Sequence, residues 1–328
     1  MCALHTTQLL TKIKGEYKLK RANDTNKSAF RVNWKILITA LSIFTCAFLA
    51  LFFIGGFFSD SGSLGFSDGK DSQRINLLIA GMDPDGLRTD FLAIASYNTA
   101  TEKADILTIP ENTRMFVGGR YQKISAAHAI YENGEAKGIL GTVEALNRLT
   151  AIPLNFYVEF SIGAFADLVD EFDNVEFDIS ENMAYRDKAQ DLNINLKKGY
   201  QRLNGKKATH LLRYTSYDGG EEKRTAVQQE FMRAFAEQKL NPEYVAKLPE
   251  LFKKLDLKSN LTAEDIIKYS NILLKLSAED LTFHTLPGHQ EEPGITYWIA
   301  DTEAQKELTE TVFGYNPEKI TIEKTKKQ

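Results

Sequence analysis

Apolar residues along this chain form one long uninterrupted segment and a series of short runs. The long segment, residues 36–58, holds 23 residues without a charged side chain, and about 20 apolar residues suffice to cross a bilayer core. The 35 residues before it carry eight basic and two acidic side chains. By the positive-inside bias, this pattern predicts a single transmembrane helix with a cytoplasmic basic tail, residues 1–35, and the main domain outside the cell. A cleaved signal peptide is the alternative, although its apolar core would be shorter.

The segment after the predicted anchor is polar. Residues 59–73 are rich in Ser, Gly and Asp and hold few apolar side chains, which is typical of a solvated tether. We therefore expect an extracellular linker over residues 59–73, a folded domain over residues 74–315 and a flexible tail over residues 316–328. The part of the chain after the anchor is long enough for one large core and does not require a second domain.

Short apolar runs and helical spacing alternate through the expected domain. The runs over residues 75–80, 91–97 and 104–109 are largely continuous, which is typical of strands buried on both faces. We expect further strands at residues 156–160, 175–179, 281–286 and 297–300, and helices at residues 124–131, 138–149, 162–172, 208–214, 221–240, 249–255, 261–276 and 302–312. Strands interleaved with helices predict an α/β fold, with a central mixed β-sheet covered by helices on both faces and preceded by the single transmembrane helix.

Charge is distributed unevenly between the two parts of the chain. The net charge of −4 combines an excess of six basic side chains before residue 59 with 32 basic against 42 acidic side chains after it. An acidic external domain is a poor partner for nucleic acid, so a transcription factor is not expected. Both cysteines, Cys2 and Cys46, precede the external part, which therefore folds without a disulfide.

A polar loop, residues 81–90, separates the first two expected strands. It contains three carboxylates and an arginine, and Asp83 and Asp90 bracket most of it. Loops at strand ends are where α/β folds build sites, and two converging carboxylates suit a hard cation such as Mg²⁺. The alternative is a solvated turn stabilised by its own Asp side chains.

A second polar cluster surrounds the start of the helix expected at residues 221–240. Arg224 and Gln228 stand one helical turn apart and share a face, and Arg213 comes from the helix before. Guanidinium groups bind phosphate bidentately, so these donors could meet on a doubly charged phosphate group. A salt-bridged surface at the helix start, with Glu221 and Glu222, is the alternative.

Several ordered motifs together resemble the LytR-CpsA-Psr family of Gram-positive envelope proteins. They extend over roughly residues 74–315: INLLIAGMD with RTD (75–90), TIPENTR (108–114), KISAAHA (123–129), FYVEF (156–160), LKKGYQRLNGKKATHLLRY (196–214) and RTAVQQ (224–229). The resemblance implies a transferase at the cell membrane. It would move a glycopolymer, such as wall teichoic acid or capsule, from a polyprenyl-pyrophosphate carrier onto peptidoglycan.

The resemblance also implies roles for individual residues. Asp83 and Asp90 would hold Mg²⁺, and Arg213, Arg224 and Gln228 would bind the pyrophosphate. Arg88, beside Asp90, would orient the acceptor or its proton, so Arg88 and Asp90 are the candidate catalytic residues.

Three positions depart from the family pattern. Glu111, Thr215 and Val227 each stand where an arginine is usual, and a carboxylate that faces a pyrophosphate is repelled by it. Arg114, Arg120 or Lys223 could supply the missing charge. Two functions therefore stay open: an active Mg²⁺-dependent phosphotransferase, and a catalytically degenerate relative that acts as an envelope lipid-binding or regulatory protein.

Overall fold

A computed structural model describes residues 73–132, 135–188, 192–291 and 297–316. The predicted cytoplasmic tail, the anchor and nearly all of the linker lie outside these residues, as does the tail from residue 317. Over the described part of the chain, no helix combines the length and the apolar character needed to cross a bilayer.

A six-stranded sheet lies at the centre of the domain, in the order β13-β8-β1-β2-β3-β14. Its strands are β1 (Arg74–Met82), β2 (Thr89–Asn98), β3 (Lys103–Thr108), β8 (Phe156–Phe160), β13 (Leu257–Ser259) and β14 (Leu281–Thr285). The pairs β1–β2, β2–β3 and β13–β8 are antiparallel, whereas β1–β8 and β14–β3 are parallel. The predicted central mixed sheet is confirmed.

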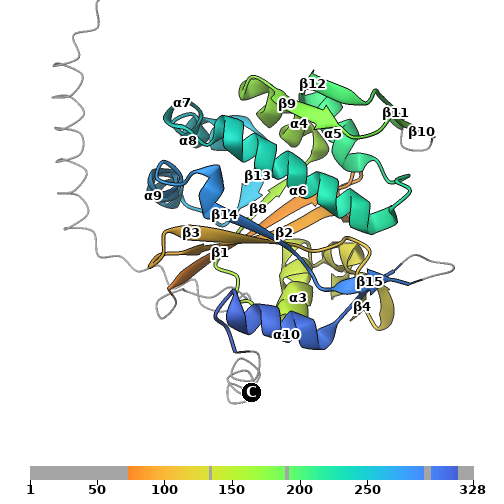
Figure 1. The fold of residues 1–328 in the computed structure, drawn as a ribbon. Coiled ribbons are helices and arrows are strands. Elements are labelled where there is room, and N and C mark those ends of the chain that lie inside the picture. The colour runs from red at the N-terminus through yellow and green to blue at the C-terminus, as the bar shows by residue number, and fades with distance from the viewer. Residues whose placement is uncertain (1–72, 133–134, 189–191, 292–296, 317–328) are drawn as a thin grey trace, which may run out of the picture. The chain divides into compact units, whose positions relative to one another are not determined.

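One face of the sheet packs on α3 (Ile139–Thr150), α10 (Thr302–Thr311) and the 3₁₀ helix η1 (Ile124–Ala129). Figure 1 shows α3 and α10 together on this side. Leu78 and Ala80 of β1 and Val143 and Leu146 of α3 are fully or almost fully buried in this core. The apolar stripe of α3 is therefore part of the core.

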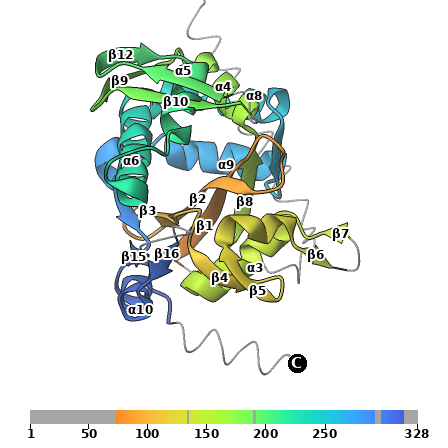
Figure 2. The ribbon, with the colours of Figure 1, turned by 90° about the vertical axis from the view of Figure 1, so that its right-hand side faces the viewer.

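The other face of the sheet is turned toward α6 (Gly220–Lys239), α8 (Leu248–Lys254) and α9 (Ala263–Leu273), which lie on the opposite side from α3 and α10 (Figures 1 and 2). Ile75, Leu77 and Ile79 of β1 alternate with Leu78 and Ala80 and line an apolar cavity of about 430 Å³ against these helices. Both faces of β1 thus meet apolar groups, which explains the continuous apolar runs.

A second core lies on the far side of α6. It joins α4 (Ile162–Glu171) and α5 (Gly205–Arg213) to the hairpins β9 (Val175–Ile179) with β12 (Gly199–Leu203), and β10 (Met183–Asp187) with β11 (Leu192–Leu196). Phe231 of α6 is buried in this core. Tyr214 and Tyr217, in the short segment between α5 and α6, and Val227 of α6 also belong to this core, so this layer holds the first part of α6 in place.

Several short elements differ from the sequence prediction. The helix expected at residues 124–131 is the 3₁₀ helix η1, and residues 114–123 form the unpredicted hairpin β4 (Arg114–Val117) and β5 (Arg120–Lys123) around Gly118 and Gly119, whose φ angles are positive. The remaining unpredicted short elements are β6 (Tyr131–Glu132), β7 (Glu135–Ala136), α7 (Pro242–Val245), η2 (Ala278–Asp280) and β15 (Gly288–Gln290). β15 pairs with β16 (Trp298–Ala300), the strand expected at residues 297–300. These elements are two to six residues long, which is too short for an apolar periodicity to show in the sequence.

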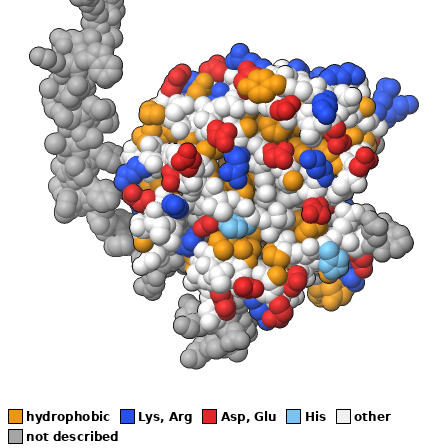
Figure 3. All heavy atoms as spheres, in the orientation of Figure 1, with side chains coloured by type: hydrophobic (Ala, Val, Ile, Leu, Met, Phe, Trp, Pro, Cys, Tyr) orange, Lys and Arg blue, Asp and Glu red, His pale blue; other side chains and the backbone are white. Residues whose placement is uncertain are grey.

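Charged side chains of both signs are interspersed over the face of the molecule shown in Figure 3, with apolar groups between them. The described residues on this face therefore form no extended basic surface of the kind that binds nucleic acid.

Candidate functional site

The loop between β1 and β2 is folded onto Asp83. The Asp83 carboxylate is buried and accepts hydrogen bonds from the backbone N–H groups of Leu87 (2.8 Å) and Arg88 (3.1 Å). The Arg88 Nε donates to its other oxygen at 3.3 Å. Asp83 thus stabilises the turn as the alternative interpretation of the sequence expected. Its role as a metal ligand stays a prediction.

Arg224, in the second turn of α6, connects three segments that are far apart in the sequence. Its side chain is buried, and its Nη1 lies 3.0 Å from Glu111 Oε1 and 3.3 Å from Glu221 Oε2. Its Nη2 donates to the backbone carbonyl of Asp90 at 3.2 Å. Burial alone would lower the pKa of Arg224, but Glu111 and Glu221 outweigh it and raise that pKa above its usual range. The guanidinium is permanently charged.

These segments surround a cavity of about 220 Å³, which we call the arginine cavity. Its charged lining residues are Arg88, Asp90, Glu111, Lys123, Arg213 and Arg224. Four cations face two carboxylates there, so the cavity carries an excess of positive charge. Of the residues predicted for the site, Arg88, Asp90, Arg213 and Arg224 converge on this cavity.

Asp90 is the most perturbed carboxyl group in the arginine cavity. Its pKa is raised from 3.8 to about 6, mainly because burial disfavours the charged form and also because Glu111 and Asp83 repel it. The nearby guanidinium groups of Arg224 and Arg213 offset only part of this effect. A carboxylate with a pKa near neutrality can accept a proton from a substrate and release it again.

The other two predicted residues lie outside the lining of the arginine cavity. Gln228 is buried, and its amide donates to the Leu212 carbonyl at 3.3 Å, which ties α6 to α5. Asp83 lines a neighbouring cavity, described below. In the structure Gln228 therefore connects two helices, and binding of pyrophosphate by Gln228 stays a prediction.

Sequence reasoning missed four residues that line the arginine cavity: Lys123, Ser125, Tyr185 and Leu192. Lys123 and Ser125 open the KISAAHA motif, and that motif was the available signal. The suggested sources of compensating charge, Arg114, Arg120 and Lys223, are not among the lining residues. Arg114 instead stacks over the Tyr121 ring at 4.8 Å, because it lies on an outward face of the β4–β5 hairpin.

The family model described as the LytR_cpsA_psr family matches residues 58–313. The chain belongs to this family. Bacillus subtilis TagT, named a polyisoprenyl-teichoic acid–peptidoglycan teichoic acid transferase, is 25% identical over 248 residues, which cover 71% of this chain and 73% of TagT. An uncharacterised protein of Staphylococcus aureus is 24% identical over 228 residues. The match covers 68% of this chain but only 55% of that protein.

Solved structures of family members share the fold. The crystal structure of B. subtilis TagV superposes with a TM-score of 0.60 at 20% identity, over 73% of this chain and 95% of TagV. TagT bound to LI-WTA gives a TM-score of 0.56 at 24% identity, over 74% of this chain and 92% of that structure.

The three departures from the LytR_cpsA_psr pattern have different structural settings. Thr215 lines the arginine cavity, and Glu111 lines it while pairing with Arg224. Val227 is buried in the second apolar core, beside Phe231 and away from the cavity. Only Glu111 and Thr215 therefore alter the charge that a ligand in the cavity would meet.

Proposed function

We propose that this protein is a phosphotransferase that moves a glycopolymer from a polyprenyl-pyrophosphate carrier onto peptidoglycan. The observation that carries this proposal is the arginine cavity, where four cations enclose a carboxylate with a raised pKa. Membership in a family in which several relatives are named teichoic acid transferases supports it, although another relative is named the regulatory protein MsrR.

The carrier would bind along α6. Arg224 near the start of this helix faces the arginine cavity, and Met232, Phe235 and Ala236 line the apolar cavity of about 430 Å³. Eight residues of helix span roughly 12 Å, a reach that suits a pyrophosphate at one end and a polyprenyl chain at the other. The predicted anchor over residues 36–58 would hold the domain at the outer face of the cell membrane, beside such a lipid.

The proposed reaction transfers the polymer phosphate to an acceptor hydroxyl. Asp90 accepts the hydroxyl proton as the oxygen attacks the phosphorus that carries the polymer. The bond from that phosphorus to the bridging oxygen breaks, and polyprenyl phosphate leaves with the electron pair. Arg213 and Arg224 stabilise the charge that develops on the phosphoryl oxygens, and Arg88 orients the acceptor. The product is a phosphodiester between polymer and peptidoglycan.

The residues present fit Mg²⁺ at Asp90 better than at Asp83. Magnesium is commonly bound by one or two carboxylates together with substrate phosphates. Asp90 offers one carboxylate inside the cavity, whereas Asp83 already accepts three hydrogen bonds from its own loop. No group of three or more potential ligands forms a metal site among the described residues. When bound, Mg²⁺ would offset negative charge on the pyrophosphate; Asp90 and the substrate would hold it.

The second candidate function is that of a catalytically degenerate lipid-binding or regulatory protein. One observation favours it: Glu111 occupies Arg224 Nη1 at 3.0 Å and so competes with a phosphate oxygen for the same donor. In this function the two cavities would bind the carrier without turning it over.

A transfer assay on the full-length chain separates the two functions. Purified protein is mixed with a polyprenyl-pyrophosphate-linked polymer, peptidoglycan and Mg²⁺, and the phosphodiester product is quantified. Asp90→Asn should reduce the transfer rate by about 100-fold or more, because it removes both the proton acceptor and the carboxylate that would hold Mg²⁺, while carrier binding persists. Asp178→Asn, on the exposed side of β9, is the matched control and should keep the wild-type rate. Carrier binding without transfer by the wild type, under conditions where TagT transfers, would establish the degenerate function instead.

A further inference from the structure

A second cavity, of about 550 Å³, lies next to the arginine cavity and is lined by residues of the β1–β2 loop, of the β4–β5 hairpin and of η1. We call it the turn cavity. Its charged lining residues are Asp83, Asp85, Arg88 and Arg120, and Gln122 of β5 adds an amide. Arg88 lines both cavities, so the two sites meet at this side chain.

We propose that the turn cavity binds the acceptor as a short stretch of uncharged glycan strand. The inference rests on the proposed transferase function, because it assigns the second substrate of that reaction to a place of its own. The volume of the turn cavity, about 550 Å³, lies within the range of small-molecule binding sites.

The charge of the turn cavity favours a neutral ligand over an anionic one. Its two carboxylates balance its two guanidinium groups, whereas the arginine cavity has four cations against two carboxylates. Carboxylates accept hydrogen bonds from hydroxyl groups, and guanidinium groups donate to hydroxyl and amide oxygens. A polyhydroxylated sugar can use both kinds of partner, whereas a phosphate would meet no excess of positive charge there.

Part of the lining of the turn cavity is apolar, and two of its apolar side chains are alanines. Ala126, Ala129 and Ile130 line the cavity together with Leu87, whose side chain is 49% exposed. Small side chains leave room for the carbon face of a sugar ring, and contact with that face removes apolar surface from water. The cavity thus offers polar groups to the hydroxyl groups of a pyranose ring and apolar groups to its carbon face.

The position of the turn cavity also suits an acceptor. The Arg88 Nε lies 3.3 Å from Asp83 Oδ2, which anchors the side chain between the cavities. Asp90, which lines the arginine cavity, follows two residues later on β2. A glycan that reaches Arg88 from the turn cavity therefore directs a hydroxyl toward the Asp90 carboxylate and the phosphate beyond it.

Two variants of the full-length chain test the assignment by binding alone. Ala126→Trp fills part of the turn cavity with an indole ring, and Arg120→Ala removes one of its two guanidinium groups. Ala263→Trp, at the exposed start of α9, controls for the added indole ring. The probes are a neutral tetrasaccharide of β-1,4-linked N-acetylglucosamine, which carries no carboxylate, and, separately, inorganic pyrophosphate. Calorimetry on detergent-purified protein measures both affinities, and thermal unfolding checks that each variant is folded.

We expect Ala126→Trp to weaken tetrasaccharide binding by about tenfold or more and Arg120→Ala by about threefold. Pyrophosphate affinity should stay within about twofold of the wild type, and Ala263→Trp should change neither affinity. If Ala126→Trp does not fold, the Arg120→Ala result decides. Tetrasaccharide affinity that neither variant alters, the absence of tetrasaccharide binding to the wild type, or competition between tetrasaccharide and pyrophosphate would each overturn the assignment. Failure of the proposed function looks different: both probes bind as expected, but the transfer assay yields no product.

Discussion

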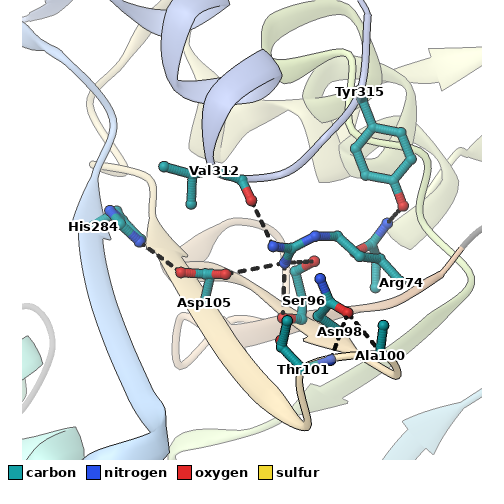
Figure 4. A network of polar contacts seen from close by, with 10 residues as sticks. Arg74, Ser96, Asn98, Ala100, Thr101, Asp105, His284, Val312 and Tyr315 are labelled. Carbon is teal, nitrogen blue, oxygen red and sulfur yellow. Dashed lines mark hydrogen bonds and ion pairs between the residues drawn. The ribbon is translucent and has the colours of Figure 1, made fainter.

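Two clusters of charged side chains in this domain differ in how fully their charges are paired. In the first, the Arg74 cluster, Arg74 Nη1 lies 3.0 Å from Asp105 Oδ2 and 3.1 Å from Ser96 Oγ, and its Nη2 donates to the Val312 carbonyl. His284 Nε2 lies 3.0 Å from the other Asp105 oxygen. Figure 4 shows Arg74 between the sheet and the end of α10, with Asp105 reached from both sides. The second cluster is the arginine cavity.

The same residue type responds in opposite ways in the two clusters. Burial would raise the pKa of Asp105, but hydrogen bonds from His284 and Arg74 outweigh it and lower that pKa below its ordinary value. Burial and the repulsion from Glu111 raise the pKa of Asp90 to about 6. Asp105 is bonded by Arg74 and His284, whereas Asp90 lines the same cavity as the carboxylate of Glu111.

This difference distinguishes a structural cluster from a candidate site. The Arg74 cluster satisfies its own charges and joins the first strand of the sheet to the end of α10. The arginine cavity holds charges that fold stability alone does not explain, since they raise the pKa of a buried acid. Perturbed groups of this kind concentrate at functional sites.

The largest effect is expected for Arg74→Met. Removal of the guanidinium breaks the part-buried ion pair with Asp105, which keeps His284 as a partner, and also breaks the hydrogen bonds to Ser96 and to the Val312 carbonyl. Hydrogen bonds to a charged group contribute about 1.5–3 kcal/mol each, so the loss should be about 3–5 kcal/mol. Urea unfolding of the full-length chain measures the loss, and pyrophosphate affinity at a temperature where the variant is folded should equal that of the wild type. A loss below about 1 kcal/mol would show that the Arg74 cluster is not structural.

Asp90→Asn should stabilise the protein. A carboxyl group whose pKa rises from 3.8 to about 6 on folding destabilises the native state by on the order of 3 kcal/mol at pH 7. The cost is absent below about pH 4 and complete above about pH 6, so the gain from Asp90→Asn should develop over that window. Asp105→Asn is the matched control with the opposite sign: its lowered pKa contributes stability above the ordinary carboxyl pKa, so this variant should be destabilised at pH 7. Equal signs for the two variants would refute the comparison.

Glu111→Gln should strengthen the binding of inorganic pyrophosphate by about tenfold, or about 1.4 kcal/mol. The change removes the carboxylate that pairs with Arg224 and repels Asp90. Calorimetric titration measures the affinity, and Glu310→Gln, on the exposed side of α10, serves as the control. Unchanged or weaker binding by Glu111→Gln would mean that Glu111 does not compete with the ligand.

Lys123→Ala should have the smallest effect, a two- to fivefold loss of pyrophosphate affinity, because a partly exposed cation contributes up to about 1 kcal/mol. The loss should shrink as salt is added, since salt screens exposed charges. A loss of affinity as large as that of Arg224→Ala in the same titration would contradict this, because it would mean that Lys123 binds pyrophosphate as strongly as the buried Arg224 does.

The sequence predicted the layers of the fold well and the short hairpins poorly. Residues 75–80, 91–97 and 104–109 differ from β1, β2 and β3 by at most two residues at either end, because burial on both faces makes an apolar run unmistakable. The β4–β5 hairpin was missed because its Phe116 and Tyr121 face solvent and its strands carry no apolar alternation. The Gly118-Gly119 pair was its one local signal.

For the site, motif order predicted that Arg88, Asp90, Arg213 and Arg224 come together, since each lies on or next to a strand or helix that an apolar core holds in place. The contacts of individual side chains could not be predicted in the same way. The Glu111–Arg224 ion pair depends on how the turn after β3 meets α6, and the place of Lys123 depends on the unpredicted hairpin.

The most direct test is a carboxyl-selective NMR titration of Asp90 and Asp105 in the full-length chain, without divalent cations. The account predicts that Asp90 titrates near pH 6 and Asp105 below its ordinary value, and that inorganic pyrophosphate raises the pKa of Asp90 while leaving that of Asp105 unchanged. An Asp90 that titrates near pH 4, or that does not respond to pyrophosphate, would contradict it.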